Sequence, residues 1–278
     1  MDFVKMHGLG NDFIVVQAGS WNEAGHYQAL AKFLCDRNFG IGADGLVITG
    51  KDDSMDIFMR IFNSDGSEPE MCGNGIRCVA KYAYENKLVK QRSIAVRTLA
   101  GPRYPEVLLD NGQFQAVRVD MGEPVLSREL IPMNGSGGNI GVPLDIAGQG
   151  FNITAVSMGN PHCIIFVPDI NAVPVNVWGP LIESHELFPA KTNVEFVQVI
   201  SDKEIVMRVW ERGAGITLAC GTGACATLVA SVLNQKSARH AAVHLLGGDL
   251  QIEWKEEDNH VYMTGPAEEV FQGTIKLG

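Results

Sequence analysis

The chain has 278 residues, enough for one large domain or two of ordinary size, and 46% of them are hydrophobic, which suffices for a packed core. Its 22 Lys and Arg residues against 32 Asp and Glu residues give a net charge of −10, which argues against nucleic-acid binding because that requires clustered basic residues. No apolar run approaches the roughly 20 residues of a membrane span, and the N-terminus lacks the pattern of a secretory signal, so we expect a cytoplasmic protein.

The first half of the chain alternates short strand-like runs with turn residues. The loop residues from His7 to Asp12 precede a strand that begins at Phe13. After Cys72, apolar residues recur at i, i+3, i+4 and i+7 from Ile76, which predicts a helix. Other elements expected in this half are a helix over 29–35 and strands over 46–49, 55–62, 93–98, 106–109 and 115–120.

The second half shows a similar mixture of strands and one apolar helix. Residues 132–150 are rich in Gly and Pro, and we expect a surface loop there, near the domain junction. Turn-rich residues 158–162 separate a strand over 151–157 from a strand over 163–167. Residues 224–233 are apolar on nearly all faces, which is typical of a helix enclosed by other elements. Strands are also expected over 194–199 and within 243–278.

Residues 57–84 and 205–233 contain one unit twice, at a constant offset of 148 positions. Each copy is a strand, a short connection and a Cys-Gly-x-Gly segment that opens a helix. Gly10-Asn11 recurs as Gly159-Asn160 at nearly the same offset, so the duplication spans most of each half. Within the unit, Ile57, Met59, Arg60, Cys72, Gly73 and Gly75 recur as Ile205, Met207, Arg208, Cys220, Gly221 and Gly223.

This internal repeat constrains the architecture. We predict an α+β fold with two pseudo-symmetric domains, each a strongly curved mixed or antiparallel sheet wrapped around a central helix. A parallel βαβ fold would need more alternating helices. The first domain is expected to comprise residues 1–118 with 265–278 and to contain Cys72. The second is expected to comprise residues 119–264 and to contain Cys220.

Cys72 and Cys220 are the cysteines whose context indicates chemistry. At the start of a helix, free backbone N–H groups and the positive end of the dipole favour a thiolate and a bound anion. Two equivalent thiols suit the inversion of a stereocentre, in which one removes a proton from carbon and the other delivers a proton to the opposite face. The anion would be a carboxylate on that carbon, and backbone amides would stabilise the charge that develops.

Other interpretations of these segments are weaker. A single Cys beside Gly is more often an inert core residue, but the duplicated glycines favour function. Zinc is disfavoured because Cys72/Cys78 and Cys220/Cys225 are spaced more widely than a Cys-x2-Cys knuckle. Residues 221–226 fit a dinucleotide fingerprint, but no acidic residue follows about 20 positions on. We therefore expect no metal and no cofactor. The cysteines expected to be structural are Cys35, Cys78, Cys163 and Cys225.

Eight motifs are spread over the chain: 7–13, 40–45, 62–66, 71–77, 159–162, 192–196, 210–213 and 219–223. Together they resemble the diaminopimelate epimerase family of PLP-independent amino acid epimerases, nearly end to end. Each motif is weak by itself, and the combination is highly specific. One departure is Gly45, because many family members carry Gln there.

The resemblance implies interconversion of LL- and meso-2,6-diaminopimelate, on the route to lysine and peptidoglycan, with Cys72 and Cys220 as the two acid–base groups. His162 and Glu211 lie where the family has residues that support catalysis. It also implies two domains that close over the substrate, and a homodimer. The substrate contacts that it implies are Asn11, Asn63, Gly73, Asn74, Asn160, Asn193, Glu211, Arg212, Gly221 and Thr222.

These residue types suit a substrate with two ammonium groups and two carboxylates. Arg212 can bind a carboxylate through two parallel hydrogen bonds, Glu211 can hold an ammonium group, and Asn side chains both donate and accept. Simpler roles stay open: a surface ion pair for Arg212, a hydrogen-bonded strand-edge residue for His162, and turns or caps for the asparagines.

A second substrate class also stays open. Relatives with the same paired cysteines racemise or epimerise other amino acids, including proline, hydroxyproline and histidine. The proline group carries different residues around both cysteines. Here Met-Cys-Gly-Asn-Gly at 71–75 and Glu-Arg-Gly at 211–213 favour diaminopimelate.

Overall fold

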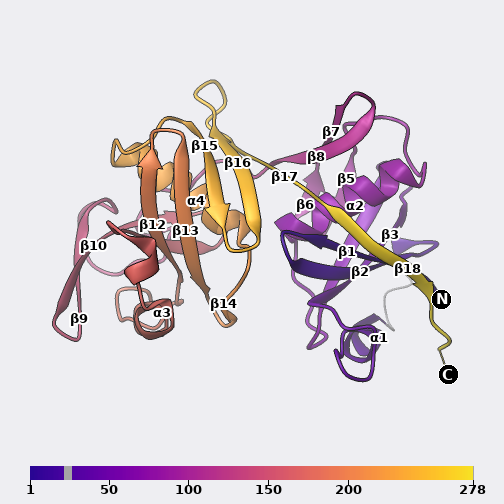
Figure 1. Ribbon diagram of the computed structural model, residues 1–278, viewed down its shortest axis with the longest axis horizontal. Coiled ribbons are helices and arrows are strands. Elements are labelled where there is room, and N and C mark those ends of the chain that lie inside the picture. Colours follow the sequence, from indigo (N-terminus) through magenta and orange to yellow (C-terminus); the bar gives the residue numbers. More distant parts are fainter. Residues whose placement is uncertain (22–26, 278) are drawn as a thin grey trace. The chain divides into compact units, whose positions relative to one another are not determined.

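The computed structural model describes residues 1–21 and 27–277. The chain forms two compact units, one made of residues 1–120 together with 264–278 and the other of residues 121–263 (Figure 1). The first unit therefore includes segments from both ends of the chain. Each unit contains one 13-residue helix among its strands, α2 in the first and α4 in the second.

The first unit is built on a mixed sheet with the strand order β18-β1-β2-β3-β4-β5-β6. The pairs β2–β3 and β4–β5 are parallel and the other pairs are antiparallel. Strands β7 and β8 form an antiparallel pair. The elements are β1 (Asp2–Gly8), β2 (Asn11–Gln17), α1 (Tyr27–Leu34), β3 (Gly45–Lys51), β4 (Ile57–Asn63), α2 (Gly73–Glu85), β5 (Val96–Thr98), β6 (Gly101–Arg103), β7 (Glu106–Asp110), β8 (Gln113–Asp120) and β18 (Glu268–Thr274).

Helix α2 forms the centre of the first unit. Ten of its 13 residues are buried, and it contacts β1, β2, β3, β4, β7 and β8. Its buried cations are satisfied by the chain that leads into β18: Arg77 donates from Nε to the carbonyl of Pro266 at 3.0 Å, and Lys81 donates to the carbonyl of Ala267 at 3.0 Å. Buried charges require such partners, so these contacts join the C-terminal segment to the first unit.

The second unit is built on a mixed sheet that runs β17-β16-β15-β13-β12-β11-β10-β9, with β14 paired to β13. The pairs β11–β12 and β13–β15 are parallel. The elements are β9 (Val142–Ile146), β10 (Gln149–Ser157), β11 (Pro161–Phe166), the 3-10 helix η2 (Ile170–Ala172), α3 (Val175–Glu183), β12 (Asn193–Ser201), β13 (Glu204–Glu211), β14 (Gly215–Ile216), α4 (Gly221–Leu233), β15 (His240–Leu245), β16 (Gly248–Trp254) and β17 (Val261–Gly265).

Helix α4 occupies the corresponding place in the second unit. Ten of its 13 residues are buried, and it contacts β10, β11, β12, β13, β15 and β16. This burial explains why its sequence is apolar on nearly all faces.

The two sheets repeat the same connectivity. The order β1-β2-β3-β4-β5-β6 in the first unit matches β10-β11-β12-β13-β15-β16 in the second. In each copy the second and third strands are parallel, as are the fourth and fifth, and the buried helix follows the fourth strand. The predicted α+β fold with a duplicated unit is confirmed.

The expected loop over 132–150 is wrong in its second part. Val142–Ile146 forms β9, and β10 already begins at Gln149. Ala147 and Gly148 join these strands with φ angles of 52° and 85°. Two successive positive φ angles are the signature of a tight hairpin turn of the primed type. The glycine content therefore indicated a hairpin as much as a loop.

Three other elements also differ from expectation. Helix α3 was not predicted, because its sequence contains Gly179 and Pro180. Gly179 is required there, since a Cβ at this position would lie 2.5 Å from the Trp210 ring. Strand β11 begins at Pro161 and so includes His162, which we expected in the preceding turn. Helix α4 starts at Gly221, directly after Cys220 as the repeated Cys-Gly-x-Gly segment predicted, and three residues before the apolar range 224–233.

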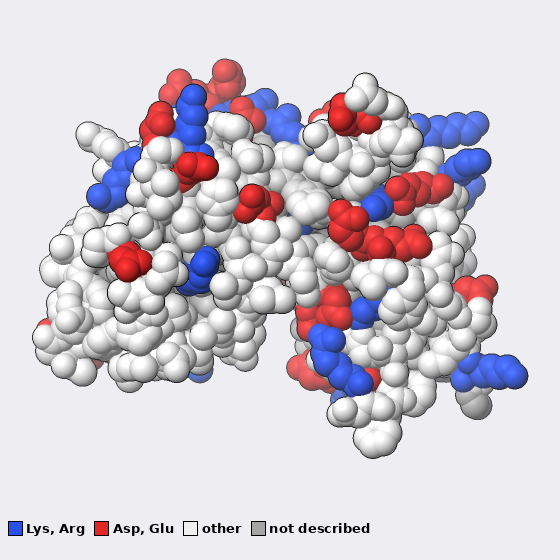
Figure 2. All heavy atoms as spheres, viewed as in Figure 1, with Lys and Arg blue, Asp and Glu red and all other residues white. Residues whose placement is uncertain are grey.

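Two general properties of the structure bear on function. None of the helices in the described residues is long and apolar enough to cross a membrane. On the face seen in Figure 2, acidic and basic side chains are interspersed over both units. That pattern, with a net charge of −10, is unlike the basic stripe of a nucleic-acid-binding surface.

Candidate active site

Each candidate catalytic cysteine caps the first turn of a buried helix. Cys72 precedes α2 and Cys220 precedes α4, and both have extended backbone angles. The Cys72 Sγ accepts a hydrogen bond from the N–H of Gly75 at 3.4 Å, and the Cys220 Sγ accepts one from the N–H of Gly223 at 3.4 Å. Each sulfur thus pairs with a backbone N–H that has no partner within its helix and lies at the positive end of the dipole.

Two asparagines lie beside Cys72 in the first unit. The Oδ1 atom of Asn11, at the start of β2, is 4.0 Å from the Cys72 Sγ. Asn74 donates from Nδ2 to the same Oδ1 atom at 3.0 Å. The structure therefore brings together four predicted site residues, because Gly73 is the first residue of α2.

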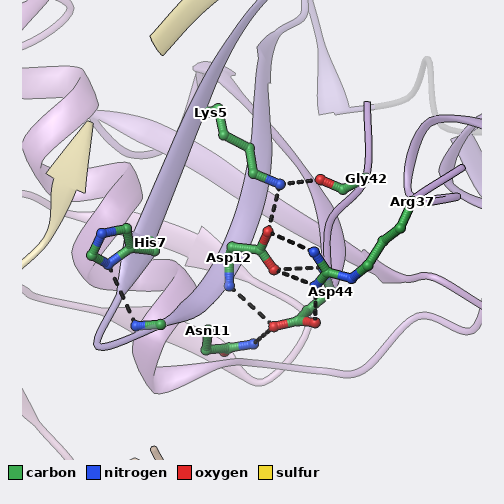
Figure 3. A network of polar contacts seen from close by, with 8 residues as sticks. Lys5, His7, Asn11, Asp12, Arg37, Gly42 and Asp44 are labelled. Atoms are coloured by element: carbon green, nitrogen blue, oxygen red, sulfur yellow. Dashed lines mark hydrogen bonds and ion pairs between the residues drawn. The ribbon is translucent and has the colours of Figure 1, made fainter. Parts of the chain in front are cut away.

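A charged network fixes the amide of Asn11 (Figure 3). Its Nδ2 donates to Asp44 Oδ2 at 2.8 Å, which leaves its Oδ1 for Asn74 and Cys72. Arg37 Nη2 bridges Asp44 Oδ1 and Asp12 Oδ1, at 2.8 Å to each. Both carboxylates are thus held in place, and the orientation of Asn11 follows from them.

Lys5 completes this network. Its Nζ lies 2.6 Å from Asp12 Oδ2 and also donates to the carbonyl of Gly42. Burial by itself would raise the pKa of Asp12, but the hydrogen bonds from Arg37 and Lys5 lower it to about 2. Asp12 is therefore ionised throughout the physiological range.

Arg77 holds the first turn of α2. Its Nη1 donates to the carbonyl of Gly73 at 3.2 Å and to Asn74 Oδ1 at 3.1 Å. Because Asn74 also donates to Asn11, the amide of Asn74 has a fixed orientation. Asn63 makes contacts of another kind, since it donates to Ser67 Oγ at 2.9 Å within the turn after β4.

Polar side chains also lead to Cys220 in the second unit. The hydroxyl of Thr222 lies 3.6 Å from the Cys220 Sγ. Asn160 donates from Nδ2 to Thr222 Oγ1 at 3.3 Å. The Oδ1 of Asn160 is 3.0 Å from Nε2 of His162. Four predicted site residues therefore form one connected set, with Gly221 opening the helix.

The other ring nitrogen of His162 contacts Glu195, which was not among the predicted site residues. Its Nδ1 lies 2.6 Å from Glu195 Oε1, and both side chains are completely buried. His162 and Glu195 are on the adjacent strands β11 and β12. His162 is thus an interior residue with a charged partner, and not the strand-edge residue of the alternative interpretation.

The carboxyl group of Glu211, at the end of β13, also interacts with Cys220. Burial raises the pKa of Glu211, while hydrogen bonds from the Thr217 hydroxyl and the Cys220 thiol oppose this effect. In turn, burial and then the charges of Glu211 and Glu195 raise the pKa of Cys220 well above its usual value.

This result corrects one expectation. The helix start was predicted to lower the thiol pKa, and the hydrogen bonds from Thr222 and Gly223 do act in that direction. Burial and the carboxylates outweigh them, so Cys220 is held as a thiol at neutral pH.

The remaining predicted residues lie around the end of β13. The buried Asn193 accepts from the backbone N–H of Arg212 at 2.9 Å and donates to the carbonyl of Pro161 at 2.8 Å. The side chain of Arg212 donates from Nη1 to the carbonyl of Ala190 at 3.0 Å. Asn193 therefore positions the backbone that carries Glu211 and Arg212.

Several residues of these networks were not predicted as site residues, among them Glu195, Asp44 and Thr217. A signal existed for Glu195, because a carboxylate in the otherwise apolar run Val194–Val197 must be buried and paired. Asp44 lies within the motif over 40–45 but was given no role, and Thr217 carried no signal, because a surface loop commonly contains Asp or Thr.

All six cysteines are free thiols, and the four expected to be structural are buried. Burial raises the pKa of Cys35 to about 11 and that of Cys78 to about 12. Among the described residues, no group of three or more His, Cys, Asp and Glu side chains is arranged to hold a metal ion.

The protein shares its fold with solved structures that include a probable proline racemase and a phenazine biosynthesis protein of the PhzF family. Over the whole chain it is similar to the crystal structure of a probable proline racemase from Agrobacterium radiobacter K84, with a TM-score of 0.72, 93% of that chain covered and 16% identity. At this identity the likeness establishes the fold.

Sequence comparison identifies the family. The family model described as diaminopimelate epimerase matches residues 3–127 and 154–270. The chain is 59% identical to the diaminopimelate epimerase of Pelotomaculum thermopropionicum, over 98% of both chains. It is 55% identical to that of Moorella thermoacetica, over 100% of both chains. The chain therefore belongs to the diaminopimelate epimerase family.

Proposed function

We propose that this protein is a diaminopimelate epimerase that interconverts LL-2,6-diaminopimelate and meso-2,6-diaminopimelate. The observation that carries the proposal is the pair of helix-capping cysteines, each with its sulfur 3.4 Å from an amide nitrogen of the first turn. The enzyme is an isomerase, and the names of its relatives imply a role in lysine biosynthesis.

In the proposed reaction, one cysteine acts as a thiolate and the other as a thiol. The thiolate of one breaks the α-carbon–hydrogen bond and becomes a thiol. The thiol of the other delivers its proton to the opposite face and becomes a thiolate. Exchange of protons with solvent restores the starting state. The raised pKa of Cys220 favours Cys220 as the cysteine that starts as a thiol and donates its proton.

The surrounding groups would bind the charges of the substrate. The α-carboxylate suits the backbone N–H groups at the starts of α2 and α4, including those of Gly73, Asn74, Gly221 and Thr222. These amides would stabilise the negative charge that develops on the carboxylate as the α-proton leaves. Glu211 would hold an ammonium group.

The remaining predicted residues would bind the second amino acid group of the substrate, the one far from the reacting α-carbon. Arg212 would bind the distal carboxylate, while Asn11, Asn63, Asn160 and Asn193 would supply further hydrogen bonds. Buried polar groups of this kind would reject a substrate that lacks the distal amino acid group, because they would then stay unpaired.

Deuterium incorporation tests the function directly. Incubation of the reduced protein with the LL isomer in D2O should give the meso isomer with deuterium at the α-carbon. A folded, reduced protein that incorporates no deuterium would rule the proposal out. The alternative, a racemase of proline or histidine type, requires turnover of an amino acid without the distal group in a substrate panel.

Matched cysteine variants test the two-base scheme. Cys72→Ala and Cys220→Ala should each abolish inversion, because each face of the α-carbon needs its own acid or base. Cys78→Ala and Cys225→Ala are the controls, since these buried cysteines lie on the same two helices and should retain turnover. Full turnover in either of the first two variants would contradict the scheme.

We also propose that the protein is cytoplasmic and forms a homodimer. Within each chain, the two compact units would be the two domains predicted from the sequence. The resemblance to the family supports these proposals. Light scattering on the purified protein measures the mass in solution, and a monomer at working concentration would contradict the dimer.

A further inference from the structure

Glu195 lies at the end of a chain of hydrogen bonds that reaches Cys220. Its carboxylate is completely buried, 2.6 Å from His162 Nδ1. It also faces the first turn of α4, because a Cβ at Gly223 would lie 2.7 Å from Glu195 Oε1 and 3.1 Å from the Cys220 Sγ. Glu195 is therefore close to the reacting sulfur without being bonded to it.

The donors and acceptors in this chain have a direction. Asn160 turns its carbonyl Oδ1 toward His162 Nε2 and its amide Nδ2 toward Thr222 Oγ1. A carbonyl oxygen can only accept, so Nε2 must carry a proton. Because Thr222 Oγ1 accepts from Asn160, its own hydrogen is available for the Cys220 Sγ at 3.6 Å. Every donor in the chain then points toward the sulfur.

Glu195 explains why Nε2 of His162 carries a proton and donates to Asn160. A neutral histidine beside an ionised carboxylate would carry its proton on Nδ1, which would leave the Nε2 lone pair facing the Asn160 oxygen. This conflict between two acceptors disappears if the pair holds two protons, one on Nε2 and one shared between Nδ1 of His162 and Oε1 of Glu195. The environment favours it, because the other oxygen of Glu195 is buried with no hydrogen-bond partner among the described residues.

We propose that Glu195 is a positioning residue that keeps the Glu195–His162 pair doubly protonated, so that Nε2 donates to Asn160 and Thr222 donates to Cys220. This chain would stabilise the Cys220 thiolate whenever it forms during turnover. If His162 lost the Nε2 proton, the Asn160 amide would turn over, and the Thr222 hydroxyl would donate to Asn160 and no longer to the sulfur. The role in turnover rests on the proposed epimerase function.

Two variants of nearly equal volume separate positioning from space filling. In Glu195→Gln, the new amide can donate to Nδ1 of a neutral His162 whose Nε2 keeps its proton, so the chain is preserved. Glu195→Leu fills the site but leaves Nδ1 without a partner. We expect kcat/KM to fall by less than about tenfold in E195Q and by about 10²-fold in E195L, the scale of a misplaced catalytic group. Equal losses in the two variants would overturn the proposal.

A double-mutant cycle tests the route through Thr222. In a Thr222→Val background the E195L substitution should have little further effect, since the last link is already absent. Ser231→Ala is the matched control, because Ser231 is buried on α4 and its hydroxyl donates to the carbonyl of Thr227 in the same helix. S231A should keep wild-type kcat/KM. Effects of E195L and T222V that simply multiply would overturn the proposal.

A readout independent of activity separates this proposal from the proposed function. Nitrogen NMR on protein labelled at histidine, with His162 assigned through a His162→Asn variant, reports the protonation of each ring nitrogen. We expect Nε2 to carry a proton in the wild type and in E195Q, whereas Nδ1 should carry a shared proton in the wild type and none in E195Q, where it accepts from the new amide. An unprotonated Nε2 in the wild type would refute the positioning role, whether or not the protein epimerises diaminopimelate.

Discussion

Asp44 Oδ2 accepts a hydrogen bond from the side-chain amide of Asn11 at 2.8 Å, and this contact leaves Asn11 Oδ1 facing Cys72 (Figure 3). An amide that is bonded at its nitrogen cannot turn over without losing that bond. A half-exposed carboxylate in a surface loop thus determines which atom of Asn11 faces the sulfur.

Asp44→Ala should therefore reduce epimerase activity although Asp44 touches neither cysteine. We expect kcat/KM to fall by about 10- to 100-fold, because Asn11 loses its fixed orientation. In an Asn11→Ala background the same substitution should have little further effect. Asp36→Ala is the control, since Asp36 is an exposed carboxylate of the same region that accepts from the backbone N–H groups of Asn38 and Phe39. A comparable loss in D36A would indicate a general loop defect.

The Asp12 cluster should make the first unit sensitive to acid. The pKa of Asp12 is lowered to about 2 in the folded state, from an ordinary value of 3.8. A lowered pKa gives stability that is fully present above the unfolded value and is lost as the pH falls toward 2. The cluster is partly exposed to solvent, so we expect a contribution on the order of 1 kcal/mol.

Asp12→Asn measures this contribution. Thermal unfolding should show a lower Tm for D12N than for the wild type at pH 6, with the difference shrinking as the pH is lowered from 4 toward 2. A difference that stays constant with pH would mean that the effect of D12N does not come from the charge of Asp12.

Features of the sequence that repeat or alternate were predictable. The duplicated Cys-Gly-x-Gly segment predicted two helices that begin at the cysteines, and α2 and α4 do begin directly after Cys72 and Cys220. Elements held together by tertiary contacts were not predictable in this way. Helix α3 forms despite Gly179 and Pro180, because Gly179 fits closely against Trp210.

The contacts within the polar networks were likewise not predictable from the sequence. The motifs over 40–45 and 192–196 contain Asp44 and Glu195, but the sequence did not indicate which residues these carboxylates orient. Asp44 is 33 residues from Asn11 and Glu195 is 33 residues from His162, so their pairing depends on which strands become neighbours. The pKa direction of Cys220 was also inaccessible, since it results from burial and from two carboxylates brought in by β12 and β13.

Glu211→Gln should lower the pKa of Cys220. Removal of the Glu211 charge takes away one of the contributions that disfavour the thiolate, while burial and Glu195 continue to raise the pKa. The rate of Cys220 alkylation, followed by mass spectrometry of its peptide, should therefore rise at a lower pH in E211Q than in the wild type. Its midpoint should still lie above that of an ordinary thiol.

Glu204→Gln provides the matched control for this measurement. Glu204 lies at the other end of β13, and its side chain is exposed. The alkylation profile of E204Q should coincide with that of the wild type. An unchanged or upward-shifted midpoint in E211Q would show that the Glu211 carboxylate does not act on the Cys220 thiol.

Gly75 and Gly223 occupy equivalent positions in the duplicated helices, yet their substitution by Ala should have different consequences. A Cβ at Gly75 would lie 3.0 Å from the terminal methyl of Met59 and 3.4 Å from Ile61 Cδ1. Met59 is flexible and can move aside. A Cβ at Gly223 would lie 2.7 Å from Glu195 Oε1, which is fixed by its bond to His162, and 3.1 Å from the Cys220 Sγ.

We therefore expect Gly75→Ala to change kcat/KM by less than about tenfold and to leave Tm unchanged or raised, since Ala favours the helix over Gly. Gly223→Ala should lower kcat/KM by about 10²-fold or more, because it displaces both the carboxylate and the sulfur. Steady-state kinetics and thermal unfolding of the two variants, measured together, test this difference. Equal effects of the two substitutions on kcat/KM would mean that Glu195 does not limit the space beside Gly223. The contacts in the structure require instead that α4 in the second unit tolerate an added Cβ less well than α2 in the first.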